Sequence, residues 1–279
     1  MLSILHAAIL GLIQGLSEFL PISSSGHLTI AGYLLGYDPE GGNLLSFNIL
    51  LHVATLFAVF AVYYKDILML IKAFFGMAGD LIHKKGFGFE KDYYRRLVVM
   101  LIIGTLPAVA SALILDDLIA SPPIWLVGVF LIVTGLILLV SDRLKSGNHN
   151  FETLSFPKAV GIGVFQAVAV LPGISRSGST IVGGLLFGLK RTNAVRFSFL
   201  LSIPAILGAL VMDIKDIFSM ETQIAGPGAI AVGMIVAAVS GYISIKLLLN
   251  IVRKSKLTYF SIYCFCAGIF AIALNFIGR

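Results

Sequence analysis

Residues 11–27 read Gly11-Leu-Ile-Gln14-Gly-Leu-Ser-Glu18-Phe-Leu-Pro-Ile-Ser-Ser-Ser-Gly-His27, and they interrupt an apolar stretch that runs from about residue 2 to residue 36. The interruption holds a carboxylate, an imidazole and three consecutive serines. A broken backbone at membrane depth is tolerated only where it is buried in protein or lines a wet cavity. The segment therefore predicts two helices joined by a polar turn, inside a protein that surrounds them.

The composition of the whole chain is that of an integral membrane protein. Of its 279 residues, 58% are hydrophobic and 12% are charged, whereas soluble domains are about a quarter charged. The apolar residues form long blocks that do not alternate, which excludes a transmembrane β-barrel. Each block is close to the roughly 20 residues that a helix needs to cross a bilayer. We predict six spans, at about residues 46–64, 97–115, 123–141, 197–213, 228–248 and 258–277.

The basic residues indicate which side of the membrane each connection occupies. Lys and Arg near span ends are typical of the cytoplasmic side, and 17 of the 20 fall within residues 65–96, 143–158, 190–196 and 246–256. The connections between these segments are acidic. The pattern predicts a cytoplasmic 65–96 loop and an extracytoplasmic N-terminus. The remaining stretches, 2–36 and 155–189, must each enter and leave the membrane on one side, so we expect an all-α polytopic fold with six transmembrane helices and two re-entrant helical hairpins.

The two interrupted stretches resemble each other at an offset of 152 residues. Gly11-Leu-Ile-Gln14 corresponds to Gly163-Val-Phe-Gln166, and Ser23-Ser-Ser-Gly26 corresponds to Ser175-Arg-Ser-Gly178. Because the charges give the two halves opposite orientations, we predict an inverted-topology repeat, in which broken helices often meet near the midplane to bind a polar ligand. The single membrane domain covers residues 1–279, with one repeat at about 2–141 and the other at about 154–277.

The first hairpin offers an acid, hydroxyls and an imidazole. Ionisable residues at membrane depth are costly, and they are functional candidates by default. Gln14 and Glu18 share a helix face by their four-residue spacing and project toward the break. The serines are good helix N-caps, and free N–H groups at a helix start attract anions. His27 follows Ser24 by three residues, so the two can face each other if the second helix begins early.

The second hairpin offers a cation. The segment Pro172–Thr180 places Arg176 in a Ser/Gly turn between apolar helices, and the forked donors of a guanidinium suit phosphate. Val170 stands where Glu18 would repeat, so the acid occurs once. These features predict a single asymmetric site, with parts from both halves, for a phosphate ester or anhydride. His52 is alone in an apolar span, and we interpret it as a buried, hydrogen-bonded histidine.

The two segments resemble motifs of the bacterial undecaprenyl-pyrophosphate phosphatases, also called bacitracin-resistance proteins. Residues Gln14–His27 are similar to their [Glu/Gln]-x-x-x-Glu motif with the Ser/Gly-His segment that follows it, and Pro172–Thr180 resembles their Pro-Gly-x-Ser-Arg-Ser-x-x-Thr motif. The resemblance implies removal of the terminal phosphate from undecaprenyl pyrophosphate, the C55 lipid carrier of cell-wall synthesis, and with it bacitracin resistance. It also implies a divalent cation, Mg²⁺ or Ca²⁺, and a site open to the extracytoplasmic side of the bacterial plasma (inner) membrane.

The resemblance also assigns roles to residues of this chain. The expected catalytic residues are Glu18, Ser24, His27 and Arg176. Residues expected to bind the substrate phosphates are Ser23, Ser25, Gly26, Ser175, Ser177, Gly178 and Thr180. The expected cation ligands are Glu18 and Gln14. Our mechanistic hypothesis is that Ser24 attacks the terminal phosphorus while His27 accepts its proton. In the rival hypothesis, His27 or Glu18 activates water directly.

Two further alternatives concern function and partners. A lipid-phosphate flippase or transporter is the second hypothesis, because inverted repeats with midplane sites are typical of transporters. Phosphate release by the purified protein would separate the two. The net charge of +6 is accounted for by topology, so nucleic acid is not expected as a partner. The expected partner is undecaprenyl pyrophosphate in the bilayer, and a homodimer is allowed.

Overall fold

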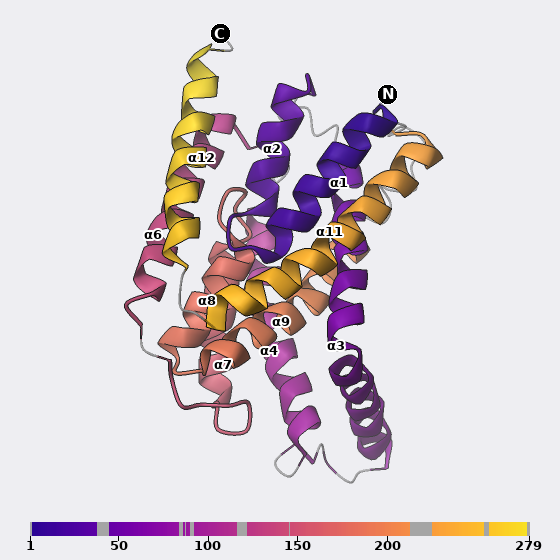
Figure 1. Cartoon of the computed structure of the whole chain (residues 1–279). Helices are drawn as coiled ribbons and strands as arrows, with labels where there is room; N and C mark the ends of the chain where they lie inside the picture. Colours follow the sequence, from indigo (N-terminus) through magenta and orange to yellow (C-terminus); the bar gives the residue numbers. More distant parts are fainter. Residues whose placement is uncertain are drawn as a thin grey trace.

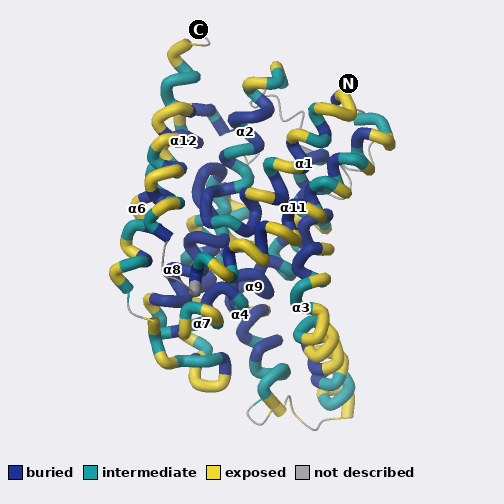
Figure 2. Tube along the Cα trace, in the orientation of Figure 1, coloured by how far each residue is buried: buried dark blue, intermediate teal, exposed yellow. Residues whose placement is uncertain are grey.

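The computed structural model describes residues 2–37, 45–83, 86, 88–89, 92–115, 122–144, 146–212, 225–253 and 257–277. Over these residues the named elements are all α-helices, which confirms the predicted all-α class (Figure 1). Burial is concentrated in the middle of the bundle, and exposed residues lie along the outer faces of the peripheral helices (Figure 2).

Six helices of the described residues are long and apolar enough to cross a membrane, as predicted. Their outward faces carry large hydrophobic side chains, such as Phe57, Leu106 and Ile269, which suit contact with lipid tails. The chain is therefore a multi-pass membrane protein. The six helices are α3 (Leu45–Ile82), α4 (Tyr93–Ile114), α6 (Ile124–Ser141), α9 (Arg191–Met212), α11 (Pro227–Arg253) and α12 (Thr258–Ile277).

Several helices extend beyond the predicted spans at the end of the molecule that carries the basic segments. The α3 helix continues to Ile82, past a kink at Tyr63 (φ −111°, ψ 25°), whereas the predicted span ended near residue 64. The α9 helix begins at Arg191 instead of near 197, and α11 runs to Arg253 instead of 248. Hydropathy marks where apolar side chains end, but backbone hydrogen bonds can continue through charged residues once these leave the hydrocarbon.

Both interrupted stretches form the predicted helical hairpins. The first consists of α1 (Ile4–Phe19) and α2 (Ser24–Leu34), and the second of α7 (Phe156–Val168) and α8 (Arg176–Leu186). Equivalent serines cap the second helix of each pair: Ser23 Oγ accepts from Gly26 N at 3.3 Å, and Ser175 Oγ accepts from Gly178 N at 3.1 Å. The sequence places the breaks here because Pro, Gly and Ser favour turns and helix starts.

The turns of the two hairpins meet inside the bundle (Figure 1). Gly173 N donates to Ser25 Oγ at 3.4 Å, and Ser177 Oγ donates to Leu20 O at 3.3 Å. Thr134 of α6 holds the second turn from the other side, since its Oγ1 donates to Gly173 O and accepts from Ser175 N, both at 2.9 Å. Gly173 has φ +103°, and a Cβ there would lie 2.6 Å from the carbonyl oxygen of Val127. Only glycine fits this turn.

Close glycine contacts pack the helices in a reciprocal pattern. A Cβ on Gly11 of α1 would overlap the carbonyl of Gly233 on α11, and one on Gly163 of α7 would overlap the carbonyl of Gly104 on α4. Between α6 and α12, a Cβ on Gly128 would lie 2.7 Å from Gly268 O, and the reverse distance is 2.6 Å. Two-fold related halves would give this pattern. The internal repeat and its bounds nevertheless stay a prediction from sequence.

We expect Gly11→Ala to destabilise the fold by about 1–3 kcal/mol, because the added methyl group meets a rigid backbone carbonyl and not a mobile side chain. Gly79→Ala on α3 is the matched control, since a Cβ there has nothing within 4 Å and alanine is the better helix former. Thermal unfolding of the two purified variants in detergent measures the difference. Equal midpoints would show that the α1–α11 contact is more adaptable than the structure implies.

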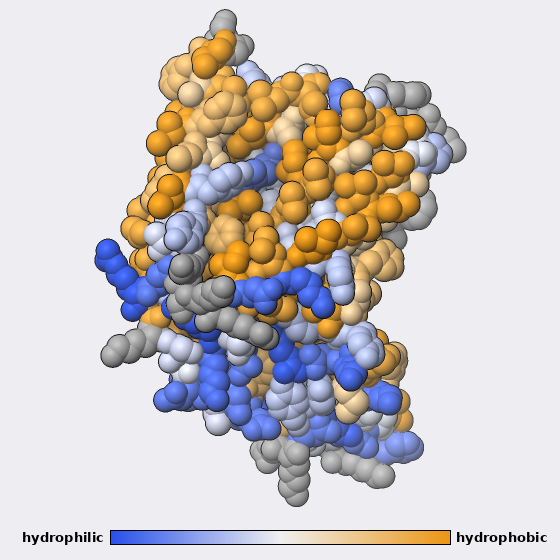
Figure 3. All heavy atoms as spheres, viewed as in Figure 1, coloured by the Kyte–Doolittle hydropathy of each residue, from blue (hydrophilic) through white to orange (hydrophobic). Residues whose placement is uncertain are grey.

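Hydrophobic residues cover most of the face seen in Figure 3, and hydrophilic residues gather at the end opposite the C-terminus. Arg96 lies in the first turn of α4, Arg143 follows α6, Lys158 lies near the start of α7 and Arg191 begins α9. Lys84, Lys85 and Lys91, on which the predicted topology partly depends, lie outside the described residues. The acidic residues of the connections near 38–40, 116–117 and 213–221 also lie outside them.

Candidate active site

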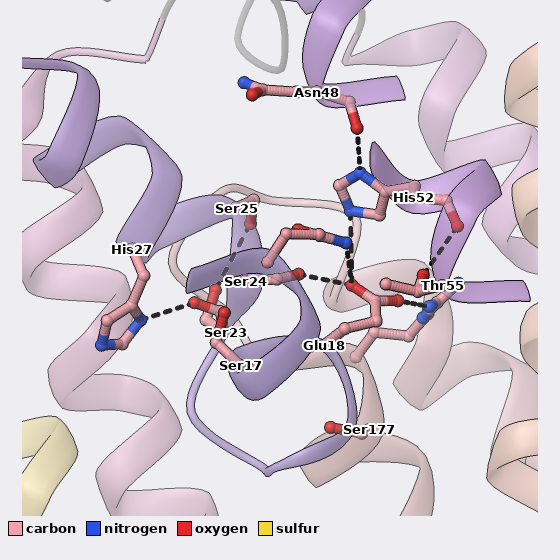
Figure 4. A network of polar contacts seen from close by, with 12 residues as sticks. Ser17, Glu18, Ser23, Ser24, Ser25, His27, Asn48, His52, Thr55 and Ser177 are labelled. Atoms are coloured by element: carbon pink, nitrogen blue, oxygen red, sulfur yellow. Dashed lines mark hydrogen bonds and ion pairs between the residues drawn. The ribbon is translucent and has the colours of Figure 1, made fainter. Parts of the chain in front are cut away.

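Glu18, near the end of α1, is the centre of the polar cluster formed by the two turns (Figure 4). Its side chain is only 2% exposed. Its carboxylate accepts hydrogen bonds from Ser24 Oγ at 2.6 Å and from Gln14 Nε2 at 3.0 Å, both on Oε2. The predicted shared face of Gln14 and Glu18 is confirmed. A buried carboxylate is stable only when it is paired and hydrogen-bonded, and this one is.

Arg176 is the cationic partner of Glu18. It is the first residue of α8, and its Nη2 donates to Glu18 Oε1 across the two hairpins. The Arg176 side chain is 21% exposed, so it is less enclosed than the side chain of Glu18. The prediction that the acid of one half and the cation of the other form a single asymmetric cluster is confirmed.

Ser24 is the hydroxyl closest to this ion pair. It is the first residue of α2, directly after Ser23, whose backbone has φ 71°. A non-glycine residue in that region costs about 1–3 kcal/mol, and such strain persists only where surrounding bonds enforce it. The bonds here come from Gly26 N to Ser23 Oγ at 3.3 Å and from His27 Nδ1 to Ser23 O at 2.7 Å. They fix the turn that aims Ser24 at Glu18.

His27 does not face Ser24, contrary to the sequence-based expectation. Its Nδ1 donates to Ser23 O, and its Nε2 lies 2.7 Å from the hydroxyl of Tyr263 on α12. The two rings are stacked, with centroids 5.4 Å apart. Figure 4 shows His27 and His52 on opposite sides of the Ser24–Glu18 pair. Two contacts hold the ring in this orientation: one ring nitrogen reaches back to the capping carbonyl of Ser23, and the other contacts Tyr263 from the distant helix α12.

His52 belongs to the cluster, which our interpretation of it as a buried, hydrogen-bonded histidine missed. The hydrogen bond is confirmed, but the side chain is 27% exposed. Its Nε2 lies 3.4 Å from Glu18 Oε2, the same oxygen that accepts from Ser24. Its Nδ1 donates to Asn48 O at 2.8 Å. Because that bond keeps one proton on Nδ1 and a carboxylate only accepts, a hydrogen bond between Nε2 and Glu18 requires one more proton on the ring or the carboxyl. A lone histidine in an apolar span belongs to no recognisable motif. Its position at membrane depth was the one sequence signal of a functional role.

The other residues expected to bind phosphate lie at the ends of the two turns or near the starts of α2 and α8, but they have structural partners. Ser23 and Ser175 cap helices, and Ser25 and Ser177 link one hairpin to the other. Thr180 is 1% exposed and bonds to Arg176 O at 2.8 Å and to Ser198 Oγ at 2.6 Å. Gly26 and Gly178 donate their N–H groups to the capping serines. Phosphate binding by these residues stays a prediction.

A divalent cation would find few protein ligands here. Among the described residues, no group of three or more His, Cys, Asp or Glu side chains could hold a metal ion. Gln14 Oε1 is nevertheless buried without a hydrogen-bond partner, beside the Glu18 carboxylate. Mg²⁺ commonly keeps several waters and binds through one or two protein oxygens together with substrate phosphates. The residues therefore fit a cation that arrives with a pyrophosphate, with Glu18 and Gln14 as its protein ligands.

The arrangement defines a class: a polytopic membrane protein whose buried Ser–Glu–Arg cluster is suited to phosphoryl chemistry at the junction of two helix hairpins. The sequence model of the bacitracin resistance protein BacA matches residues 7–270 of the chain. The chain belongs to the bacitracin resistance protein BacA family. It is 41% identical over 276 residues to the undecaprenyl-diphosphatase of Alkaliphilus metalliredigens, covering 96% of this chain and 98% of that one. It is 42% identical over 281 residues to the undecaprenyl-diphosphatase of Methanosphaera stadtmanae, covering 99% of each.

Proposed function

We propose that the protein hydrolyses undecaprenyl diphosphate to undecaprenyl phosphate and inorganic phosphate. Family membership supports the activity, and the full-length relatives described above carry the name of this enzyme. The observation that carries the chemistry is the placement of Ser24 Oγ 2.6 Å from Glu18 Oε2, while Arg176 pairs with the other oxygen. The names of these relatives give no support to the alternative of a lipid flippase.

In the proposed first step, Ser24 Oγ attacks the terminal phosphorus of the diphosphate. The bond between that phosphorus and the bridging oxygen breaks, and undecaprenyl phosphate leaves. Glu18 Oε2 accepts the proton of Ser24, because it already accepts the hydrogen bond from that hydroxyl. A serine needs such a base, since its hydroxyl is a weak nucleophile at neutral pH. Glu18 thus replaces His27 of our initial hypothesis, and His27 instead holds the Ser23 turn.

The ion pair supplies a way to couple proton transfer to substrate binding. While Arg176 neutralises Glu18, the carboxylate is a poor base. The phosphate oxygens of the substrate compete for the guanidinium, which is the more exposed partner and has donors suited to phosphate. Once Arg176 turns to the phosphates, Glu18 is free to take the proton.

Glu18 passes this proton to the departing undecaprenyl phosphate and becomes a base again. It then takes a proton from the water that attacks the phosphoserine. The bond between phosphorus and Ser24 Oγ breaks, Ser24 Oγ regains a proton from Glu18, and inorganic phosphate leaves.

A Mg²⁺ or Ca²⁺ ion is part of the proposal. The Glu18 oxygen that Arg176 leaves and the unpartnered Oε1 of Gln14 would hold it together with the pyrophosphate oxygens, while the other oxygen of Glu18, Oε2, accepts the proton of Ser24. Such an ion neutralises charge on the pyrophosphate and on the departing lipid phosphate. Glutamine is a neutral ligand, so binding of the ion would depend on the substrate more than in a site with two carboxylates.

The activity is tested by measuring phosphate release from undecaprenyl diphosphate by the purified protein in detergent, with and without chelator. We expect release that stops on chelation and returns with added Mg²⁺ or Ca²⁺. A pure flippase would move lipid in proteoliposomes and free no phosphate. Phosphate release that chelator does not change would support the phosphatase activity and contradict the proposed requirement for a cation.

We expect His52→Ala to lower turnover about 100-fold, because the ring shares Glu18 Oε2 with Ser24 and gives the transferred proton a second location. His52→Gln should retain more activity, since its amide can still donate to the carboxylate. His6→Ala is the control, a histidine bonded to Tyr37 near the start of α1. Initial rates of phosphate release measure the effect. Equal rates in His52→Ala and the control would show that His52 contributes to packing and not to turnover.

The proposed location is the bacterial plasma membrane, with the site open to the extracytoplasmic side and the 65–96 loop in the cytoplasm. We expect a single cysteine at position 6 to react with an impermeant maleimide in intact cells, and one at position 83 to react only after permeabilisation. Both are placed in a background that lacks the native Cys264 and Cys266. Labelling at position 83 in intact cells would show that the orientation is the reverse of the one proposed.

The sequence also allows a homodimer. The mass of the detergent-solubilised protein tests whether it forms.

A further inference from the structure

A second polar site lies where α6 ends and α9 begins, and it shares no residue with the Glu18 cluster. It is a cavity of about 720 Å³. Its lining includes three cationic side chains, Arg143, Lys190 and Arg191, and one carboxylate, Asp142. Neutral polar groups and an apolar wall complete it: Ser146, Asn148, Thr192, Leu144 and Val252.

The carboxylate in this cavity already accepts hydrogen bonds from the start of another helix. Asp142 accepts from Leu257 N at 3.1 Å, from Thr258 N at 2.8 Å and from Thr258 Oγ1 at 2.6 Å, so it caps the start of α12. Arg143 and Lys190 are exposed and form no ion pair with the described residues. Among the described residues, the cavity therefore has three cationic side chains against one carboxylate.

Arg191 is the most enclosed of the three cations, with a side chain that is 11% exposed. Its Nη2 donates to Ser141 O at 3.2 Å and to Leu144 O at 3.0 Å, which ties the end of α6 to the start of α9. Its Nη1 is buried without a hydrogen-bond partner, 3.9 Å from Asp142 Oδ1. Arg191 therefore has Asp142 as an ion-pair partner, whereas the two exposed cations beside it have no carboxylate partner among the described residues.

We propose that this cavity binds a phosphate-bearing anion. The exposed cations Arg143 and Lys190, the enclosed Arg191 beside them and the N-terminus of the 22-residue helix α9 together match the charge and the acceptor oxygens of a phosphate. The cavity lies where the membrane-spanning helix α6 ends and the membrane-spanning helix α9 begins, which is the edge of the spanning part of the bundle. Basic cavities between helices at such an edge suit anionic lipid headgroups. The same chemistry would accept free phosphate, so the source is decided by experiment.

The test measures the unfolding midpoint of the full chain in a neutral detergent. Three additions are compared: phosphatidylglycerol, zwitterionic phosphatidylcholine and inorganic phosphate. The test variant is Arg143→Ala/Lys190→Ala, which spares the structural bonds of Arg191. The matched control is Lys65→Ala/Lys72→Ala, which removes the same charge from exposed positions on α3. Phosphatase activity of both variants without added lipid should equal that of the wild type, which verifies their folding.

We expect phosphatidylglycerol or phosphate to raise the midpoint of the wild type and of the control by about 5 °C at saturation, and to raise that of the test variant by less than half as much. Protection by phosphatidylglycerol alone identifies a lipid headgroup, and protection by inorganic phosphate identifies a free anion. The proposal is overturned if the test variant responds like the wild type, if both double variants lose the response equally, or if phosphatidylcholine protects as well as phosphatidylglycerol.

Discussion

Replacing Arg176 with alanine is expected to lower turnover about 1,000-fold or more. Its guanidinium is the cation closest to Glu18 and Ser24, and it comes from the opposite hairpin. Loss of a fixed donor that stabilises transferring phosphoryl charge costs about 100- to 1,000-fold, and loss of a cationic arginine costs more. Phosphate release at saturating substrate measures this loss. Lysine at position 176 should rescue only part of it, because its single ammonium group cannot make the forked contact.

The same substitution leaves Glu18 buried without its cation, so folding needs its own control. Breaking a buried pair by removing one partner costs about 3–5 kcal/mol. The double variant Glu18→Gln/Arg176→Ala removes both charges and should recover the unfolding midpoint while remaining inactive. Arg143→Ala, an exposed arginine outside the cluster, should keep full activity. Turnover of Arg176→Ala near that of the wild type would contradict the proposed role of Arg176 in binding the phosphates of the substrate.

Replacing Ser24 with alanine is expected to lower turnover about 1,000-fold or more, with substrate affinity within about threefold of the wild type. The hydroxyl that is lost is the one bonded to Glu18 Oε2. It is the proposed nucleophile, whereas binding energy resides mainly in Arg176 and the lipid tail. The wild type should also form a phosphoserine. Acid quenching of the enzyme with substrate labelled on the terminal phosphate, followed by peptide mapping, should place that label on Ser24.

Ser17→Ala is the matched control, because the Ser17 hydroxyl donates to Ile13 O within α1 at 2.5 Å and does not contact the carboxylate. This variant should behave as the wild type. If Ser24→Ala keeps a sizeable fraction of turnover and no labelled enzyme is trapped, the covalent route is wrong. Glu18 would then activate water directly, as in the rival hypothesis.

The sequence by itself determined the number and kind of the elements. Long apolar blocks have few alternatives in a bilayer, since a spanning backbone must satisfy its hydrogen bonds internally. The turns at Pro21 and Pro172 also follow from local sequence. Proline, glycine and serine end one helix and cap the next, whatever surrounds them. For this reason the six spans, the two hairpins and the pairing of Gln14 with Glu18 follow from spacing along the chain.

Only the tertiary structure decided which side chains face the Glu18 carboxylate. His27 lies three residues from Ser24 in sequence, yet it turns to Ser23 O and to Tyr263, which is 236 residues away. His52 carries no motif, yet the packing of α3 against α1 brings it to Glu18. Orientation at a helix start depends on which acceptors and aromatic rings the neighbouring helices present. Those neighbours come from distant segments, so no local spacing rule could supply them.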